Sequence, residues 1–337
     1  MSRFCLPRDI YHGKGCLEEL KNLKGKKAIL VVGGGSMKRQ GFLDRAVGYL
    51  KEAGMEVQLF EGVEPDPSVE TVMKGAEAMR AFEPDWIVSM GGGSPIDAAK
   101  AMWAFYEYPD TTFEELCTPF NFPELRQKAK FCAIPSTSGT ATEVTAFSVI
   151  TNYQTGVKYP LADFNITPDV AIVDPDLVAG LPVKQVAYTG MDALTHAIEA
   201  YIGRSTTKQT RAASIEAIQL IFDNLQTAYK NGNDKTARRN MLRASYLAGT
   251  AFTKSYVGYV HAVAHSLGGQ YGIPHGLANS VLLPIVLEAY GSAAHKKLAH
   301  LARITKLSSS PDDTTAANAF IAHIRKMNAS MNIPTTL

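Results

Sequence analysis

Four of the chain's eight histidines fall between residues 196 and 275, and an aspartate lies close to the first of them. Asp192 and His196 are spaced i, i+4 in GMDALTHAIEAY, and His261 and His265 repeat this spacing in GYVHAVAHSLGG. Residues four apart lie on the same face of an α-helix, so each pair can present two ligands side by side. His275 follows in a Pro-His-Gly turn.

This residue set is typical of a divalent metal site. Carboxylate and imidazole ligands with no thiolate favour Fe²⁺ or Zn²⁺, between which the sequence does not choose. A single buried histidine is more often a hydrogen-bonded core residue, but two pairs and a separate Pro-His-Gly favour a metal. The five candidates exceed the four ligands that such a site needs. One of them is therefore predicted to do proton chemistry instead, and spacing alone does not say which.

A glycine-rich turn, Gly91-Gly-Gly-Ser-Pro-Ile-Asp97, follows a predicted strand at 85–91. Ser94 is predicted as the N-cap of the next helix, with Pro95 at its first position and Asp97 three residues after the cap. A helix that begins at the carboxyl end of a strand favours a bound phosphate. An ordinary capped turn is the alternative, because the segment lacks the GxGxxG spacing.

Two further polar loops could contribute to a nucleotide site. The turn Gly33-Gly-Gly-Ser-Met-Lys-Arg39 has no acidic residue at its tip, and Lys38 and Arg39 end it. It is predicted to accept the 2′-phosphate of NADP(H), with a solvated basic turn as the alternative. The loop 135–143 carries five hydroxyls in seven residues. These hydroxyls could bind a pyrophosphate or satisfy their own backbone.

The elements that position these residues change character along the chain. Short apolar runs alternate with helical patterns in the first half, which predicts parallel βαβ units. The expected strands are 27–33, 57–60, 85–91 and 131–134, and the expected helices are 42–54 and 68–82. Helical patterns then dominate, at 192–202, 211–230, 237–254 and 294–304. We therefore predict an α/β domain at 1–181 and an all-helical domain at 182–337.

Composition excludes several classes of protein. The chain has 337 residues, of which 46% are apolar and 20% charged, as in ordinary globular proteins. Lys plus Arg is 34 and Asp plus Glu is 32, a net charge of +2, which indicates neither a nucleic-acid nor a membrane partner. The sequence contains no run of about 18 apolar residues, the length that a membrane-spanning helix needs. The four cysteines are scattered without a CxxC pair, which favours a reducing, cytoplasmic compartment.

Four motifs carry a resemblance to a known family, the iron-containing (group III) alcohol dehydrogenases. They are GGGSPIDAAK at 91–100, IPSTSGTATEVT at 134–145, GMDALTHAIEAY at 190–201, and GYVHAVAHSLGGQYGIPHGLAN at 258–279. The resemblance implies an N-terminal dinucleotide-binding α/β domain and an all-α metal-binding domain, as in the dehydroquinate synthase-like fold. The turn at Gly34 to Ser36 resembles the NADP(H)-using butanol dehydrogenase branch.

The resemblance also implies roles for individual residues. Asp192, His196, His261 and His275 would be the metal ligands, and His265 would relay a proton near the nicotinamide. Phe252 and Tyr256 would contribute to the substrate pocket. The cofactor would be bound by Gly34, Gly35, Ser36, Asp66, Gly92, Gly93, Ser94, Asp97, Ser136, Thr137, Thr140, Val149, Lys158 and Leu177.

The function implied is an NAD(P)-linked alcohol dehydrogenase or aldehyde reductase. Hydride would pass between nicotinamide C4 and a small primary alcohol or aldehyde polarised by Fe²⁺ or Zn²⁺, with NADP(H) favoured and a homodimer expected. A dehydroquinate-synthase-like lyase is one alternative, although no Lys/Arg cluster for an acidic substrate occurs near 190–280. An inactive metal- and nucleotide-binding protein is the other, because the chain stops short of the family's terminal helices.

Overall fold

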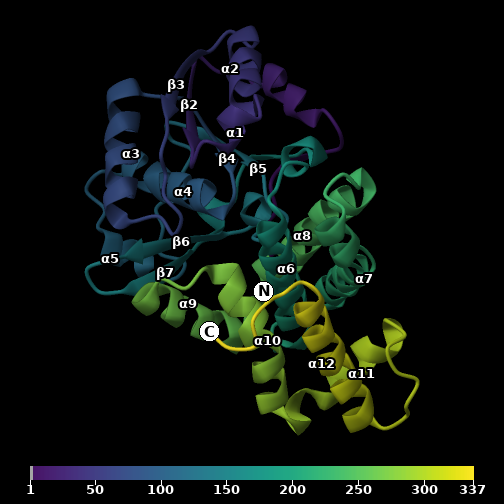
Figure 1. Cartoon of the computed structure of the whole chain (residues 1–337). Helices are drawn as coiled ribbons and strands as arrows, with labels where there is room; N and C mark the ends of the chain where they lie inside the picture. Colours follow the sequence, from purple (N-terminus) through teal and green to yellow (C-terminus); the bar gives the residue numbers. More distant parts are fainter. Residues whose placement is uncertain (1–2) are drawn as a thin grey trace. The chain divides into compact units, whose positions relative to one another are not determined.

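The structure, a computed structural model, describes residues 3–337 and divides the chain into two compact units. The units are Met1–Gly180 and Leu181–Leu337, so the boundary falls one residue before the position predicted from the sequence. The first unit is α/β and the second is helical, in agreement with the predicted fold class (Figure 1).

The N-terminal unit is built on a six-stranded sheet with strand order β1-β8-β5-β4-β2-β3, in which every pair is parallel. The four predicted strands are β2 (Lys27–Val32), β3 (Glu56–Phe60), β4 (Trp86–Gly91) and β5 (Lys130–Pro135). Two strands of four residues were not predicted, β1 (Asp9–His12) and β8 (Val170–Val173). A separate antiparallel hairpin joins β6 (Phe147–Asn152) to β7 (Val157–Ala162).

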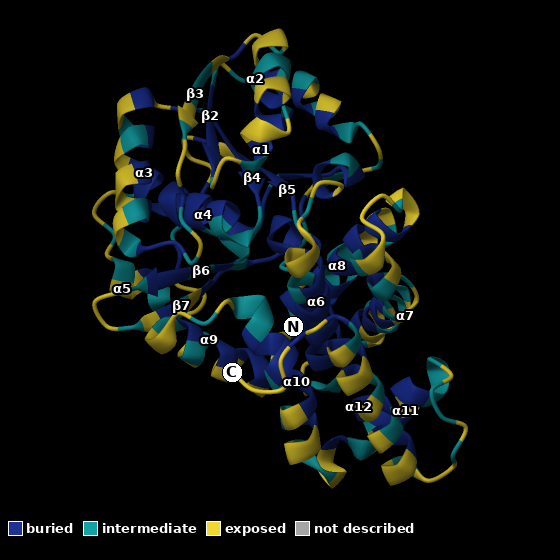
Figure 2. Ribbon diagram, in the orientation of Figure 1, coloured by how far each residue is buried: buried dark blue, intermediate teal, exposed yellow. Residues whose placement is uncertain are grey.

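The inner strands of this sheet are buried on both faces, whereas the edge strands β1 and β3 are partly exposed (Figure 2). In β2, Ile29 and Val31 face a core that includes α3 (Val69–Phe82) and α4 (Gly93–Glu107). The alternate residues of β2 face a second core that includes α2 (Phe42–Glu52). Burial on both faces explains the unbroken apolar runs of the strands. The shorter elements of this unit are η1 (Cys16–Asn22), α1 (Ser36–Arg39), α5 (Phe113–Cys117), η2 (Thr142–Val144), η3 (Phe164–Ile166) and η4 (Pro175–Val178).

The strand order places a topological switch at β2. The chain leaves β2 towards β3 on one side and later returns to β4 on the other side. In open α/β sheets, ligands bind outside the carboxyl ends of the strands at such a point. The glycine turns 33–35 and 91–93 come at the carboxyl ends of β2 and β4, so both lie at the switch.

The C-terminal unit consists of seven helices and, within its described residues, no strand. They are α6 (Val183–Ile202), α7 (Lys208–Lys230), α8 (Lys235–Ser255), α9 (Tyr259–Tyr271), α10 (His275–Tyr290), α11 (Ser292–Ile304) and α12 (Asp313–Ser330). Helix α6 packs against α7, α8 and α10, which explains why it is buried on nearly all sides. No single described helix is long and apolar enough to cross a membrane; α10 and α11 reach that threshold only as a pair bent by 118°.

Candidate metal and cofactor sites

Three helices of the C-terminal unit bring the predicted metal ligands together. Asp192 and His196 lie in the middle of α6, His261 lies in the first turn of α9, and His275 is the first residue of α10. Asp192 Oδ1 lies 3.6 Å from His261 Nε2 and 3.4 Å from His275 Nε2. The ligand atoms of this trio all lie within 4.8 Å of one another, so one ion could contact all three.

His196 lies beside the trio in a different arrangement. Its Nδ1 is 3.9 Å from Asp192 Oδ2, and its ring stacks between His261 and Phe252 with centroid distances of 4.3 and 4.2 Å. His265, one turn along α9 from His261, lies 5.1 Å from His275 between ring centroids. The structure therefore places all five predicted residues in one cluster, and their division into ligands and proton relay stays a prediction.

The electrostatics of the cluster favour a bound cation. Burial by itself raises the pKa of the Asp192 carboxyl, but the neighbouring His196 and His275 outweigh it and hold that pKa well below 3.8. Burial lowers the pKa of His261, yet the nearby carboxylates of Asp192 and Glu199 reverse this and raise it to about 9. The two shifts have opposite causes: the neighbouring histidines stabilise the Asp192 carboxylate, and the carboxylates of Asp192 and Glu199 stabilise positive charge at His261.

The donor set fits a divalent transition metal. His261 Nε2 is buried and has no hydrogen-bond partner among the residues that the structure describes. A buried nitrogen of this kind costs free energy unless a ligand satisfies it. Asp192 and the imidazoles would hold Fe²⁺ or Zn²⁺ through one oxygen and ring nitrogens. The residues present therefore fit the metal that the sequence predicts.

Two polar residues of this cluster were missed by the sequence analysis. Glu199 Oε2 is 2.6 Å from His261 Nδ1, and Asn279 Nδ2 donates to Asp192 Oδ1 at 2.7 Å. Helical spacing could have found both, because Glu199 is seven residues after Asp192 and Asn279 is four residues after His275.

The two predicted substrate-pocket residues flank the end of α8. Phe252 is buried, and its ring covers one face of the His196 ring. Tyr256, directly after the helix, is 39% exposed and has φ 64° and ψ −179°. Non-glycine residues rarely adopt this backbone conformation, which costs about 1–3 kcal/mol and is found most often at functional sites. The substrate role of both residues stays a prediction.

In the N-terminal unit, two of the predicted cofactor loops, 91–93 and 135–143, meet at the carboxyl edge of the sheet. A Cβ at Gly92 would lie 3.2 Å from Thr137 Cγ2, and a Cβ at Gly93 would lie 2.9 Å from Thr140 Cγ2. Ser136 N donates to Gly91 O at 2.7 Å, which joins the loop 135–143 to the end of β4. These glycines therefore allow the closest approach of the two loops, where a larger residue would push them apart.

Helix α4 begins earlier than predicted. Its N-cap is Gly92, which makes no side-chain cap, so Ser94 is already inside the helix and its predicted capping role is wrong. The hydroxyl of Ser94 instead accepts a hydrogen bond from Asp66 N at 3.2 Å. Asp66 in turn pairs with the buried Lys158 at 2.6 Å. Because the first amides of a helix have no partner within it, an uncapped N-terminus suits a phosphate.

Asp97 supports the loop rather than capping the helix. Its carboxylate accepts from Thr142 Oγ1 at 2.5 Å and from Val149 N at 3.0 Å. One turn later, the buried Lys100 Nζ donates to the carbonyl oxygens of Thr142, Thr145 and Phe147 at 2.7–2.8 Å. Helix α4 therefore holds the chain from η2 to the start of β6 through two charged side chains, neither of which is exposed.

The remaining predicted cofactor residues lie at two places. A Cβ at Gly34 would meet nothing within 4 Å, whereas a Cβ at Gly35 would lie 2.9 Å from Arg39 Nη1. Ser36 begins α1, so the predicted turn opens a helix of only four residues. Leu177 is 1% exposed and packs inside the core shared with α2, so its side chain fills the core there.

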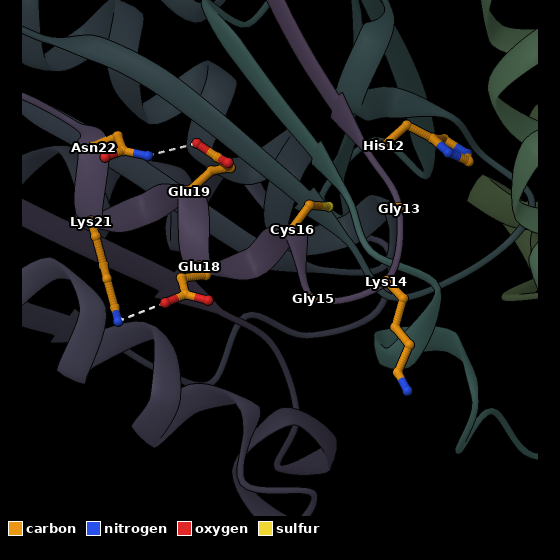
Figure 3. Close-up of a pocket in the computed structure, with 9 residues that line it drawn as sticks. All are labelled: His12, Gly13, Lys14, Gly15, Cys16, Glu18, Glu19, Lys21 and Asn22. Atoms are coloured by element: carbon orange, nitrogen blue, oxygen red, sulfur yellow. Dashed lines mark hydrogen bonds and ion pairs between the residues drawn. The ribbon is translucent and has the colours of Figure 1, made fainter.

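A hollow on the N-terminal unit is lined by residues 12–22 and contains none of the predicted residues (Figure 3). Two lysines line it: Lys14 is exposed, and Lys21 is paired with Glu18 at 2.8 Å and with Glu52 at 3.0 Å. The thiol of Cys16 is half-buried, which raises its pKa to about 12 and makes it a poor nucleophile. This hollow therefore does not resemble an anion or catalytic site.

Comparisons with known proteins show the family to which this chain belongs. Residues 7–175 match the family of iron-containing alcohol dehydrogenases, and residues 186–337 match the C-terminal domain of the same family. The chain belongs to this family and is an alcohol dehydrogenase, an oxidoreductase. Membership implies a metal ion and a nicotinamide cofactor, and it does not favour the lyase or the inactive binding protein.

Individual relatives agree with this assignment. The chain is 58% identical to an NADPH-dependent butanol dehydrogenase of Clostridium saccharobutylicum over 100% of its own length and 86% of that protein. It is 42% identical to a 1,3-propanediol dehydrogenase of Klebsiella pneumoniae over 95% of this chain and 82% of that one. A crystal structure of a 1,3-propanediol oxidoreductase superposes with a TM-score of 0.92 at 38% identity, covering 99% of this chain and 88% of that one.

Proposed function

We propose that the protein interconverts short primary alcohols and aldehydes with NADP(H), and that Fe²⁺ is its metal. The observation that carries this proposal is the trio of Asp192, His261 and the partly exposed His275, whose ligand atoms lie within 4.8 Å of one another. The relation to an NADPH-dependent butanol dehydrogenase supports both the substrate class and the coenzyme.

Each part of the chain has a defined task in this proposal. Asp192 and the histidines of α6, α9 and α10 would hold the metal, which when bound acts as a Lewis acid towards the substrate oxygen. His265, beside this cluster, would exchange the proton of the substrate hydroxyl with solvent. The glycine turns at the carboxyl ends of β2 and β4 would bind the phosphates of the coenzyme.

The proposal is tested by following NADPH absorbance with butyraldehyde. Protein purified without oxygen is analysed for metals, then stripped with a chelator and reloaded with Fe²⁺ or Zn²⁺. We expect the stripped protein to be inactive and Fe²⁺ to restore more turnover than Zn²⁺. Protein that binds metal and NADPH but leaves NADPH unchanged with every short aldehyde would refute the proposed function.

Coenzyme preference is tested at Gly34. The wild-type enzyme is expected to have a higher kcat/KM with NADPH than with NADH, because Lys38 and Arg39 flank the turn and no carboxylate occupies its tip. The change Gly34→Asp adds a carboxylate in open space. Repulsion of roughly 1–3 kcal/mol between this carboxylate and the 2′-phosphate would lower kcat/KM for NADPH about tenfold to a hundredfold.

The matched control is Gly34→Asn, which has the same size without the charge. We expect it to keep the NADPH preference, while NADH turnover changes little in either variant. A wild-type enzyme that prefers NADH, or an equal loss in both variants, would contradict the assignment of this turn.

We also propose a cytoplasmic homodimer. The support for a reducing compartment is that all four cysteines are free. The support for a dimer is that β1 lies at the edge of the sheet, with β8 as its neighbour on one side. An edge strand offers unpaired backbone groups to a second chain.

A further inference from the structure

The carboxylate of Glu199 holds two groups of helix α9 at once. Glu199 lies on α6 and is buried. Its Oε2 is 2.6 Å from His261 Nδ1, and its Oε1 accepts a hydrogen bond from Val260 N at 2.8 Å. One side chain thus binds both the ring of His261 and a backbone amide in the first turn of the helix that carries it.

This contact decides which nitrogen of His261 carries the proton. A carboxylate only accepts hydrogen bonds, so His261 Nδ1 must donate to Glu199. In the neutral ring, Nε2 then keeps its lone pair and can bind a metal. Nε2 is also the nitrogen that lies 3.6 Å from Asp192 Oδ1 and has no hydrogen-bond partner among the described residues.

Packing leaves Glu199 little freedom to move. Gly258 is the N-cap of α9, and a Cβ at this position would lie only 2.7 Å from Glu199 Oε1. The absence of a side chain at Gly258 therefore makes the room that the carboxylate occupies. The same contact fixes where α9 begins relative to α6, and so fixes the position of His261 relative to Asp192.

The second effect of Glu199 is its charge. Within the ligand trio, Asp192 is the sole carboxylate. A divalent ion bound there would keep one uncompensated positive charge in a buried environment, which is costly. Glu199 supplies a second negative charge across the His261 ring without taking a coordination position.

We propose that Glu199 is a positioning residue that sets the metal affinity of the site through His261. This inference rests on the proposed function, since it assigns the trio to a metal. Outer carboxylates of this kind typically change metal affinity by 10–100-fold when they are replaced. We expect a loss of that size for Glu199→Gln.

The variant Glu199→Gln keeps the size of the side chain but cannot make both contacts. If the amide oxygen accepts from Val260 N, the amide nitrogen faces His261 Nδ1 and favours the ring form with its proton on Nε2. If the amide is reversed, its nitrogen faces the Val260 N–H. The matched control is Glu216→Gln, an exposed carboxylate paired with Arg243 at 2.6 Å on the surface of the same unit.

The test is a titration of metal-stripped full-length protein with Zn²⁺ against a chromophoric chelator, repeated with Co²⁺ and its visible absorption bands. Glu199→Gln should weaken binding 10–100-fold and change the Co²⁺ spectrum, while Glu216→Gln binds as the wild type does. Gly258→Ala should weaken binding in the same direction, because its Cβ displaces the carboxylate.

The outcomes separate this inference from the proposed function. If the wild type binds metal and Glu199→Gln binds within about threefold of it with an unchanged spectrum, the inference is wrong and the function stands. If the wild type itself binds no metal under these conditions, the proposed function fails first and the inference fails with it. A variant with a lower melting temperature but unchanged metal affinity would show that Glu199 serves only the fold.

Discussion

Replacing His261 with alanine is expected to abolish both bound metal and turnover. His261 contributes the Nε2 atom, which lies 3.6 Å from Asp192 Oδ1 and is the buried, unpartnered nitrogen of the trio among the described residues. Its loss removes a ligand from the centre of the cluster and leaves Glu199 as a buried carboxylate without the ring it holds. We expect kcat with butyraldehyde to fall by at least about a hundredfold to a thousandfold, the loss typical when stabilisation of the reacting oxygen is removed.

The neighbouring residue on the same helix is the appropriate contrast. His265→Ala should retain most of the metal, because His265 lies outside the trio, and should change the rate and its pH profile instead. Metal content by elemental analysis and kcat from pH 5 to 10 measure both effects. Full metal-dependent activity in His261→Ala would remove it from the ligand set. Loss of metal in His265→Ala would make that residue a ligand.

The variant Lys100→Met is expected to have the second-largest effect, on the N-terminal unit. Lys100 is fully buried, and burial lowers its pKa to about 8. Its ammonium donates to three carbonyls of the segment 142–147, and methionine would remove this donor from all three. Breaking a buried charge network from one side typically costs about 3–5 kcal/mol of stability.

The loss should also reach the coenzyme loops. The segment that Lys100 holds continues from the loop of Thr137 and Thr140, which packs against Gly92 and Gly93. We therefore expect NADPH binding, measured by fluorescence titration, to weaken at least about tenfold, together with a lower midpoint of denaturant unfolding. The exposed Lys74→Met on α3 is the control and should change neither quantity.

The double variant Lys100→Met with Glu143→Gln separates two effects: the uncompensated charge of Glu143 and the lost hydrogen bonds to the loop carbonyls. Burial raises the pKa of Glu143 to about 7, and the charge of Lys100 acts in the opposite direction. Without Lys100 this carboxylate would lose that compensation, so adding Glu143→Gln should recover part of the stability. NADPH binding should stay weak, because the carbonyls of the loop remain without their donor. Unchanged stability and NADPH affinity in Lys100→Met would contradict the role assigned to this lysine.

Local patterns in the sequence predicted much of the site's contents. The spacing of Asp192 and His196 places both on one face of α6, and the apolar runs ending in glycine mark the carboxyl ends of β2 and β4. These signals depend on residues a few positions apart, which a helix or strand brings to one face by its own geometry. The family resemblance added the individual roles.

The predictions of caps and strands failed where contacts between residues distant in sequence decided the local structure. Ser94 has the residue type of an N-cap, but its hydroxyl accepts from Asp66 N, 28 residues away in sequence. Strands β1 and β8 are only four residues long, and their pairing with each other joins positions about 160 residues apart. Nothing in a window of ten residues could show either contact.

By itself, the amino-acid sequence determined the alternation of strands and helices from β2 to β5, the two-part division near residue 180, and the residue types available for metal and phosphate binding. The tertiary structure alone decided that Asp192, His261 and His275 lie within 4.8 Å between ligand atoms, and that Glu199 turns the free nitrogen of His261 towards Asp192. The physical reason is the distance along the chain over which each kind of interaction acts. Helical and strand periodicity acts over a few residues, whereas the packing of α6 against α9 and α10 sets distances between residues more than 60 positions apart.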